Sequence, residues 1–186
     1  MSQFRLQRAA ECIARGGVIA YPTEAVWGLG CDPFNADAVA RLLRLKNRSP
    51  AKGLILVAGD IAQFQPWLMQ LSSHDYRLLA DSWPGPVTWL VPVNEFTPAW
   101  ISGNFDTVAL RVSAHPLIRQ LTQRLAMPVV STSANPQGYL PARSSLTVRR
   151  YFPTGLDAIL PGATLGAAKP SEIRSLLTGE VVRTSQ

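Results

Sequence analysis

Apolar residues recur along this chain at two different spacings, and each spacing predicts a different kind of element. Residues 6–13 carry apolar side chains at helical spacing until Gly16-Gly17 stops the pattern. The same criterion predicts helices at residues 36–45, 61–69, 73–82 and 115–125, and a helical turn at 148–152. Short apolar runs between them predict buried strands at 18–21, 54–58, 88–91, 108–112, 129–130 and 158–160, and a further apolar segment lies at 23–32.

The pattern is looser near the carboxyl end of the sequence. Residues 161–169 are rich in Gly and Ala and predict a loop, whereas 170–173 and 180–183 predict two strand segments joined by a turn at 177–179. Strands and helices alternate through most of the chain, which favours an α/β layered domain (α+β in some schemes) with a twisted, largely buried sheet. The 186 residues contain no repeat, low-complexity tract or linker, so we expect a single domain spanning 1–186.

Composition narrows the class of protein. Apolar residues make up 47% of the chain and charged residues 16%, which excludes a disordered protein. The net charge is +6, from 18 Lys and Arg against 12 Asp and Glu. This excess favours an anionic partner, either a phosphate-bearing small molecule or nucleic acid, although a modest basic excess is also common in proteins without one.

Neither a membrane nor an oxidising compartment is indicated. The first residues lack the apolar segment of a signal peptide, and no run approaches the roughly 18 apolar residues of a membrane span. Cys12 and Cys31 form no C-x-x-C pair and cannot make a disulfide framework. We therefore expect a cytoplasmic protein without membrane contact.

A polar loop follows the strand predicted at residues 129–130. Ser131, Thr132, Ser133 and Asn135 place three hydroxyls and an amide there, and Pro136 prevents a helix from following at once. Open α/β sheets usually bind ligands in such loops at strand ends. An ordinary Ser/Asn turn is the alternative.

Cations gather on a second segment, directly before the strand predicted at 54–58. Lys46, Arg48 and Lys52 lie beside a Pro/Gly break. A point charge together with a planar guanidinium fork makes a phosphate clamp. A structural role is the alternative, because cations are also favoured near the carboxyl end of a helix.

Two further polar residues lie within predicted strands. Thr88 begins one strand with its hydroxyl available, and Arg111 is the single charge inside the strand at 108–112. A buried arginine is costly without an anionic partner. Because no neighbour in sequence offers a carboxylate, we expect Arg111 either to reach solvent at an edge or to face a ligand pocket.

Several kinds of site are absent from the sequence. There is no G-x-S-x-G elbow, no zinc-ligand spacing and no P-loop, and Gly28-Leu29-Gly30 lacks the third glycine of the dinucleotide fingerprint because Pro33 occupies that position. The remaining cations, hydroxyls and amide suit phosphoryl or nucleotidyl transfer, in which positioning and charge neutralisation supply most of the catalysis.

Seven motifs resemble, in order and spacing, those of the YrdC-like family. They are Tyr-Pro-Thr-Glu-Ala-Val-Trp-Gly-Leu-Gly (21–30), Lys-Asn-Arg (46–48), Lys-Gly-Leu-Ile-Leu-Val (52–57), Trp-Pro-Gly-Pro-Val-Thr (83–88), Leu-Arg-Val (110–112), Ser-Thr-Ser-Ala-Asn (131–135) and Pro-Ser-Glu-Ile (170–173). Members of this family are threonylcarbamoyl-AMP synthases, nucleotidyltransferases that join L-threonine, bicarbonate and ATP and release pyrophosphate. Their product serves the threonylcarbamoyladenosine modification at position 37 of tRNA.

The resemblance implies both a fold and a set of site residues. The fold is a three-layer α/β domain with a mixed twisted sheet and a basic concave face, as in the short, single-domain branch. The implied catalytic residues are Lys46 and Arg48. The implied ATP-binding residues are Thr88, Ser133, Asn135, Arg143 and Arg183, and those for threonine are Thr23, Arg111 and Ser171. Mg²⁺ is implied with ATP as substrate, and neither a protein metal site nor a protein nucleophile is implied.

The chain departs from the common family pattern in two places. Ser49 precedes Pro50 and Gly53 replaces a later proline, while Glu172 replaces the commoner threonine beside Ser171. The implied partners include downstream tRNA threonylcarbamoyl-transfer enzymes and weak RNA binding. A double-stranded RNA-binding or tRNA-binding module without catalysis is the alternative function. Cations scattered over separate loops favour the enzyme.

Overall fold

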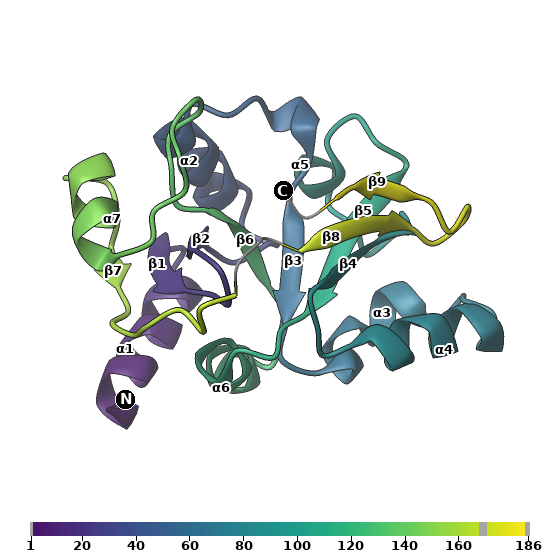
Figure 1. Cartoon of the computed structure of the whole chain (residues 1–186). Coiled ribbons are helices and arrows are strands. Elements are labelled where there is room, and N and C mark those ends of the chain that lie inside the picture. The colour runs from purple at the N-terminus through teal and green to yellow at the C-terminus, as the bar shows by residue number, and fades with distance from the viewer. Residues whose placement is uncertain (1, 168–170, 185–186) are drawn as a thin grey trace.

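A mixed sheet of nine strands runs through the described part of the molecule, in the order β7-β1-β2-β6-β3-β5-β4-β8-β9 (Figure 1). The structure is a computed structural model that describes residues 2–167 and 171–184. The strands are β1 (Ile19–Pro22), β2 (Trp27–Gly30), β3 (Ile55–Ala58), β4 (Val87–Pro92), β5 (Thr107–Val112), β6 (Val129–Ser133), β7 (Ala158–Ile159), β8 (Glu172–Ser175) and β9 (Val181–Arg183).

Helices of very different length cover this sheet. The α-helices are α1 (Gln3–Ala14), α2 (Ala36–Lys46), α3 (Gln65–Leu68), α4 (Ser73–Ser82), α5 (Ala99–Ser102), α6 (Pro116–Leu125) and α7 (Ser145–Tyr151). Two short 3₁₀ helices, η1 (Pro50–Lys52) and η2 (Ile61–Phe64), flank β3. No helix of the described residues is long and apolar enough to cross a membrane.

Parallel and antiparallel pairs are interleaved in the sheet. The pairs β1–β7, β3–β5 and β4–β8 are parallel, whereas β2 and β6 pair only with antiparallel neighbours. The sheet is therefore mixed, as the family resemblance implied.

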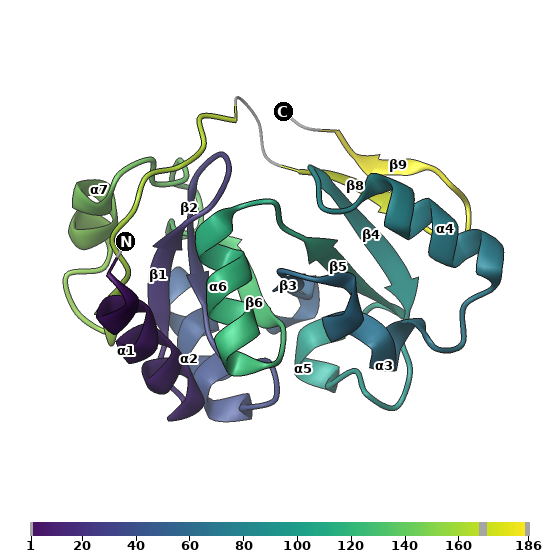
Figure 2. The ribbon, with the colours of Figure 1, turned by 90° about the horizontal axis from the view of Figure 1, so that it is seen from below.

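Alternation along the strands creates a core on each face of the sheet, because successive side chains of a strand point to opposite faces. Tyr21 and Val57 belong to the core that packs under α1 and α6, which lie side by side in Figure 2. Ala20 and Leu56, each one residue away, belong to the core that includes α2 to α5 and α7. Two helical layers thus enclose the sheet, and the predicted three-layer domain is confirmed.

Two helix ends position the residues of the site. At the end of α2, Asn47 adopts the left-handed conformation (φ 50°), and its N–H bonds to the carbonyl of Arg44. This left-handed cap turns the chain out of the helix just before Arg48. At the start of α6, the imidazole of His115 accepts from the N–H of Leu117, and Pro116 occupies the first turn, where its missing N–H costs nothing.

The structure differs from the sequence-based expectations in a few elements. The helix predicted at 61–69 is divided between η2 and α3, and the one-turn helix α5 was not predicted because four residues show no periodicity. The loop predicted at 161–169 has no regular structure through Ala167, and residues 168 and 169 lie outside the described residues. The strand predicted from Pro170 begins at Glu172 as β8, and Pro170 itself is also outside the described residues.

Candidate functional site

A cavity of about 690 Å³ lies over the face of the sheet that also carries α6. Its floor comes from four neighbouring strands, β2, β6, β3 and β5. Strand register places Ser133 beside Gly28, and Val57 beside Arg111, so that these residues share one face. The walls come from residues 23–26, the segment after α2, the turn at 85–86, residues 165–167 and the β8–β9 region. They include Thr23, Glu24, Arg48, Ser171 and Arg183.

Arg111 faces this cavity because of its position in β5. Burial alternates along the strand, with Val108, Leu110 and Val112 in the core and the intervening residues half-buried. Arg111 is therefore on the open face of the sheet, where it lines the cavity. Of the two alternatives expected from the sequence, a solvent-exposed edge or a pocket, the geometry shows the pocket.

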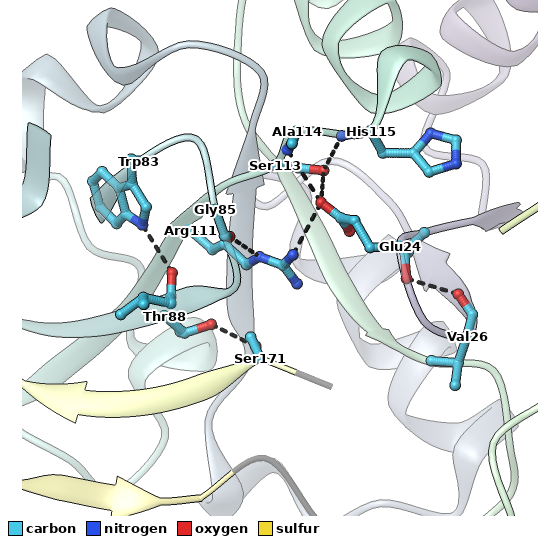
Figure 3. Close-up of polar contacts among 12 residues, drawn as sticks. Glu24, Val26, Trp83, Gly85, Thr88, Arg111, Ser113, Ala114, His115 and Ser171 are labelled. Carbon is cyan, nitrogen blue, oxygen red and sulfur yellow. Dashed lines mark hydrogen bonds and ion pairs between the residues drawn. The ribbon is translucent and has the colours of Figure 1, made fainter. Parts of the chain in front are cut away.

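The partner of Arg111 corrects one expectation. No carboxylate lies near Arg111 in sequence, but in the structure its Nη2 lies 2.9 Å from Oε1 of Glu24 (Figure 3). Its Nε also donates to the carbonyl of Gly85, at 3.0 Å. Burial lowers the pKa of Arg111, and the charge of Glu24 opposes that shift. Glu24, which is distant in sequence, is therefore a protein partner that the sequence-based expectation did not include.

Arg48 and Arg183 form a second cationic group on the cavity wall. Nη2 of Arg48 donates to the carbonyls of Lys52 (3.3 Å) and Gly53 (2.9 Å), and Nη2 of Arg183 donates to the carbonyl of Ser171 (3.3 Å). Burial lowers the pKa of Arg48, and repulsion from Arg183 lowers it further. Among the described residues neither guanidinium has a carboxylate within ion-pair distance. This end of the cavity is suited to an anion.

Lys46 lies behind the cavity wall and does not line the cavity. It is the last residue of α2, not a loop residue as predicted, and it is only 4% exposed. Its ammonium donates to the carbonyls of Ser133 and Asn135, the latter at 2.7 Å. Burial and then repulsion from Arg48 lower its pKa to about 8. These contacts tie the end of α2 to the polar loop after β6.

The sequence predicted a loop from Ser131, but β6 extends through Ser133, so that only Asn135 of the two candidate residues lies in the loop. One of the two lies inside the cavity and the other outside it. Ser133 lines the cavity. The amide nitrogen of Asn135 donates to the carbonyls of Pro136 (3.2 Å) and Tyr139 (2.7 Å), and its Oδ1 is buried without a partner among the described residues. Asn135 therefore shapes the loop, while Ser133 reaches the space that a ligand would fill.

Thr88 and Ser171 meet on the opposite wall. Thr88 is fully buried in β4, and its hydroxyl lies 2.8 Å from that of Ser171, which precedes β8 (Figure 3). The expectation of an available Thr88 hydroxyl was wrong because the parallel pairing of β4 with β8 brings Ser171 against it. Of the two residues, Ser171 lines the cavity.

Thr23 and Arg143 have contrasting positions. Thr23 lines the cavity, where its hydroxyl donates to the carbonyl of Val26 at 2.7 Å and fixes the turn between β1 and β2. Arg143 is exposed and lies outside the residues that line the cavity. The structure thus brings together Thr23, Arg48, Arg111, Ser133, Ser171 and Arg183, and places Lys46, Thr88, Asn135 and Arg143 away from the cavity surface.

Comparison with known proteins assigns the chain to a family. A profile of the Sua5–YciO–YrdC family, described as "Telomere recombination", matches residues 11–185. The chain belongs to this family. A threonylcarbamoyl-AMP synthase from Cellvibrio japonicus (strain Ueda107) is 54% identical over 181 residues, which cover 97% of this chain and 96% of that protein. Another from Pseudomonas aeruginosa (strain UCBPP-PA14) is 55% identical over 183 residues, which cover 98% of each chain.

Solved structures of the Sua5–YciO–YrdC family have the same fold. Sua5 of P. abyssi complexed with L-threonine gives a TM-score of 0.92 at 28% identity, covering 100% of this chain and 55% of that chain. The present chain therefore spans little more than half of that Sua5 chain. YciO of E. coli gives a TM-score of 0.87 at 24% identity, covering 99% of this chain and 90% of that chain, and supports the fold alone.

Glu24 is the residue of the site that was missed in the sequence. It belongs to the first family motif, and both Glu24 and Arg111 line the cavity. The sequence contained one signal for Glu24. It is a carboxylate between Thr23 and an apolar segment, and a buried cation elsewhere in the chain requires a compensating charge. Which carboxylate supplies that charge depends on how the loop after β1 folds towards β5.

The donor groups do not form a resident metal site. The described residues contain no group of three or more His, Cys, Asp or Glu that could hold a metal ion. In the cavity wall the carboxylate of Glu24 is already engaged by Arg111.

Proposed function

We propose that this protein is a threonylcarbamoyl-AMP synthase that forms L-threonylcarbamoyladenylate and pyrophosphate from L-threonine, bicarbonate and ATP. The observation that carries the proposal is identity of 54% and 55% to two synthases of that name over nearly their whole length. The cavity supports it, because Arg48 and Arg183 have no carboxylate within ion-pair distance among the described residues, whereas Arg111 is paired with Glu24. A triphosphate and an amino acid need these two kinds of surroundings.

The triphosphate of ATP is placed at the end of the cavity that carries Arg48 and Arg183. Both guanidinium groups are half-buried or at the cavity rim, and neither is neutralised by a carboxylate among the described residues. Ser133 is the floor residue that approaches the nucleotide. Asn135 and Lys46 support this end from behind. The family signature also assigns Thr88 and Arg143 to ATP, but neither residue lines the cavity.

Threonine is assigned to the part of the cavity near Thr23, Arg111 and Ser171, which borders the ATP end because Arg183 donates to the carbonyl of Ser171. A guanidinium can hold a carboxylate by two parallel hydrogen bonds, and Arg111 spends its Nε and Nη2 on protein groups. Ligand contact is therefore assigned to its Nη1. The hydroxyl of Ser171, oriented by Thr88, lies on the same wall.

The reaction needs positioning and charge neutralisation more than a protein nucleophile. The neutral amine of threonine forms an N–C bond to bicarbonate, a C–O bond breaks, and the oxygen leaves as water with a proton from the nitrogen, which gives a carbamate. A carbamate oxygen then attacks the α-phosphorus of MgATP. The bond from that phosphorus to the bridging oxygen of the β-phosphate breaks, and pyrophosphate leaves with the electron pair. The described lining residues include neither Cys nor His, whereas Arg48 and Arg183 can stabilise the charge that develops on the phosphates.

The decisive test is the substrate requirement for pyrophosphate release. We expect release only when ATP, threonine and bicarbonate are all present. Release that continues undiminished without threonine would identify a plain ATPase instead. The assay should be run with purified protein and each substrate omitted in turn.

The proposal extends to the cellular setting. We place the enzyme in the cytoplasm, where its product would pass to tRNA threonylcarbamoyl-transfer enzymes. The cavity arginines lie within a concave site and not along one exposed stripe, which favours small ligands over a nucleic-acid backbone. Any RNA binding should therefore be weak and steeply salt-dependent, because it would rest on phosphate contacts alone.

A further inference from the structure

Among the described residues, the arginines of the cavity differ in whether a carboxylate balances their charge. Arg48 and Arg183 have no carboxylate within ion-pair distance among the described residues, whereas Arg111 is paired with Glu24 at 2.9 Å. The threonine end therefore contains one positive and one negative charge close together. Such a pair presents opposite charges to a ligand, while the ATP end presents positive charge only.

The carboxylate of Glu24 is held in a fixed position. In addition to Arg111, its Oε1 accepts from the hydroxyl of Ser113 at 2.7 Å and from the N–H of Ala114 at 3.1 Å (Figure 3). Ala114 lies just before α6, and the amino end of a helix favours negative charge. The side chain is only 12% exposed, so it cannot easily swing out into water. Its negative charge thus stays beside the cavity wall.

We propose that Glu24 makes the amino-acid end of the cavity selective for a zwitterion over an anion. This inference rests on the proposed function and deepens it. The carboxylate of an amino acid is attracted by Arg111, and its ammonium group is attracted by the negative charge of Glu24. An anion of the same shape without the ammonium group gains the first attraction and suffers repulsion from Glu24.

The same charge keeps phosphate groups out of the amino-acid end. Without Glu24, the cavity would carry three uncompensated guanidinium groups, from Arg48, Arg111 and Arg183, and a polyphosphate could bind at either end. Specificity of this kind requires a repulsive element as well as an attractive one. Glu24 supplies the repulsion at one end, and its absence from the other leaves that end free for the triphosphate.

A purely structural role for Glu24 makes a different prediction. Glu24 joins the loop after β1 to Ser113 and Ala114, and its loss could displace Arg111 without any effect of charge. In that case every ligand of this end should be weakened alike. A selectivity role instead changes the ratio of two affinities, so the test must compare two ligands that differ only in the ammonium group.

The experiment is a set of calorimetric titrations with L-threonine and with the 2,3-dihydroxybutanoate of matching configuration, in which a hydroxyl replaces the ammonium group. The wild type, Glu24→Gln and Ser113→Ala are compared. We expect Glu24→Gln to lower the ratio of threonine affinity to dihydroxybutanoate affinity about tenfold or more, as for one lost charge-assisted contact. Ser113→Ala removes one hydrogen bond to the same carboxylate but no charge, and should keep the wild-type ratio.

The outcomes separate the inference from the function on which it rests. A folded Glu24→Gln variant with the wild-type ratio, or an equal change in Ser113→Ala, would overturn the selectivity role while leaving the synthase assignment intact. Failure of the wild type to bind threonine would overturn the proposed function itself, and the inference with it. If Glu24→Gln does not fold, Glu24→Gln/Arg111→Gln replaces it. The ratio should fall there too, because both ligands lose Arg111 but only threonine loses a partner for its ammonium group.

Discussion

Lys46 and Arg48 are two residues apart, yet they belong to regions of opposite character. Lys46 lies on the buried side of α2, 4% exposed, with its ammonium directed to the carbonyls of Ser133 and Asn135. Arg48 follows the left-handed Asn47 and lines the cavity near Arg183. The supporting wall, around Lys46, is thus held together by contacts within the protein. The ligand-facing wall, with Arg48 and Arg183, leaves cationic groups available to a ligand. Residues of one sequence motif can therefore have two roles: some support the cavity wall, and others face the ligand.

The largest effect is expected on the ligand-facing wall. Replacing both cations, Arg48→Ala/Arg183→Ala, should weaken ATP binding about a hundredfold or more, because each charge-assisted contact contributes about 1.5–3 kcal/mol and about 1.4 kcal/mol corresponds to a factor of ten. Each single variant should lower activity about tenfold or more for the same reason. The measurement is an ATP titration together with a thermal melt. Unchanged ATP affinity in the double variant would show that this wall does not hold the nucleotide.

On the supporting wall, the pH dependence of stability tests Lys46. Its pKa is lowered from 10.5 to about 8 in the folded protein, so between these values the unfolded chain binds more protons than the folded one. The unfolding free energy should therefore rise with pH across that window. Between pH about 7.5 and about 10, the unfolding free energy of the wild type should rise by on the order of 2–3 kcal/mol more than that of Lys46→Met. Urea unfolding of both proteins at the two pH values measures it, and parallel pH profiles would contradict it.

A smaller effect is expected at the contact between Thr88 and Ser171. Thr88→Val removes one hydroxyl at nearly constant shape and leaves the Ser171 hydroxyl without its 2.8 Å partner, which should cost about 1 kcal/mol. If Thr88 acts through Ser171, the losses of threonine affinity in Thr88→Val and Ser171→Ala will not add in the double variant. Fully additive losses would mean that Thr88 acts independently of Ser171.

The smallest effect is expected at Arg143. This residue is exposed and lies away from the cavity lining, in contrast to Arg48 and Arg183. Arg143→Ala should change ATP affinity and unfolding free energy by no more than about 0.5 kcal/mol. It also serves as the matched control for the arginine variants above. A loss as large as that of Arg183→Ala would place Arg143 on the ligand-facing wall after all.

Much of the fold and part of the site could be predicted from the sequence. The helices at 73–82 and 116–125 and the strand containing Arg111 follow from periodicity and from Gly and Pro positions, which report local conformation and the buried face. The polar loop predicted to start at Ser131 was placed too early, because β6 continues through Ser133. The family motifs supplied the mixed, three-layer architecture. The short helix α5 was missed because a single turn contains too few positions for a period to show.

The sequence by itself therefore determined most of the longer helices and strands, which segments carry polar groups, and that burial of Arg111 would require an anionic partner. Only the tertiary structure decided that Glu24 is that partner, that Lys46 supports the loop after β6, and that Thr88 is covered by Ser171. The physical reason is that periodicity describes each segment alone. Which side chains meet depends on the order β2-β6-β3-β5-β4-β8, which brings distant segments together through burial on both faces of the sheet.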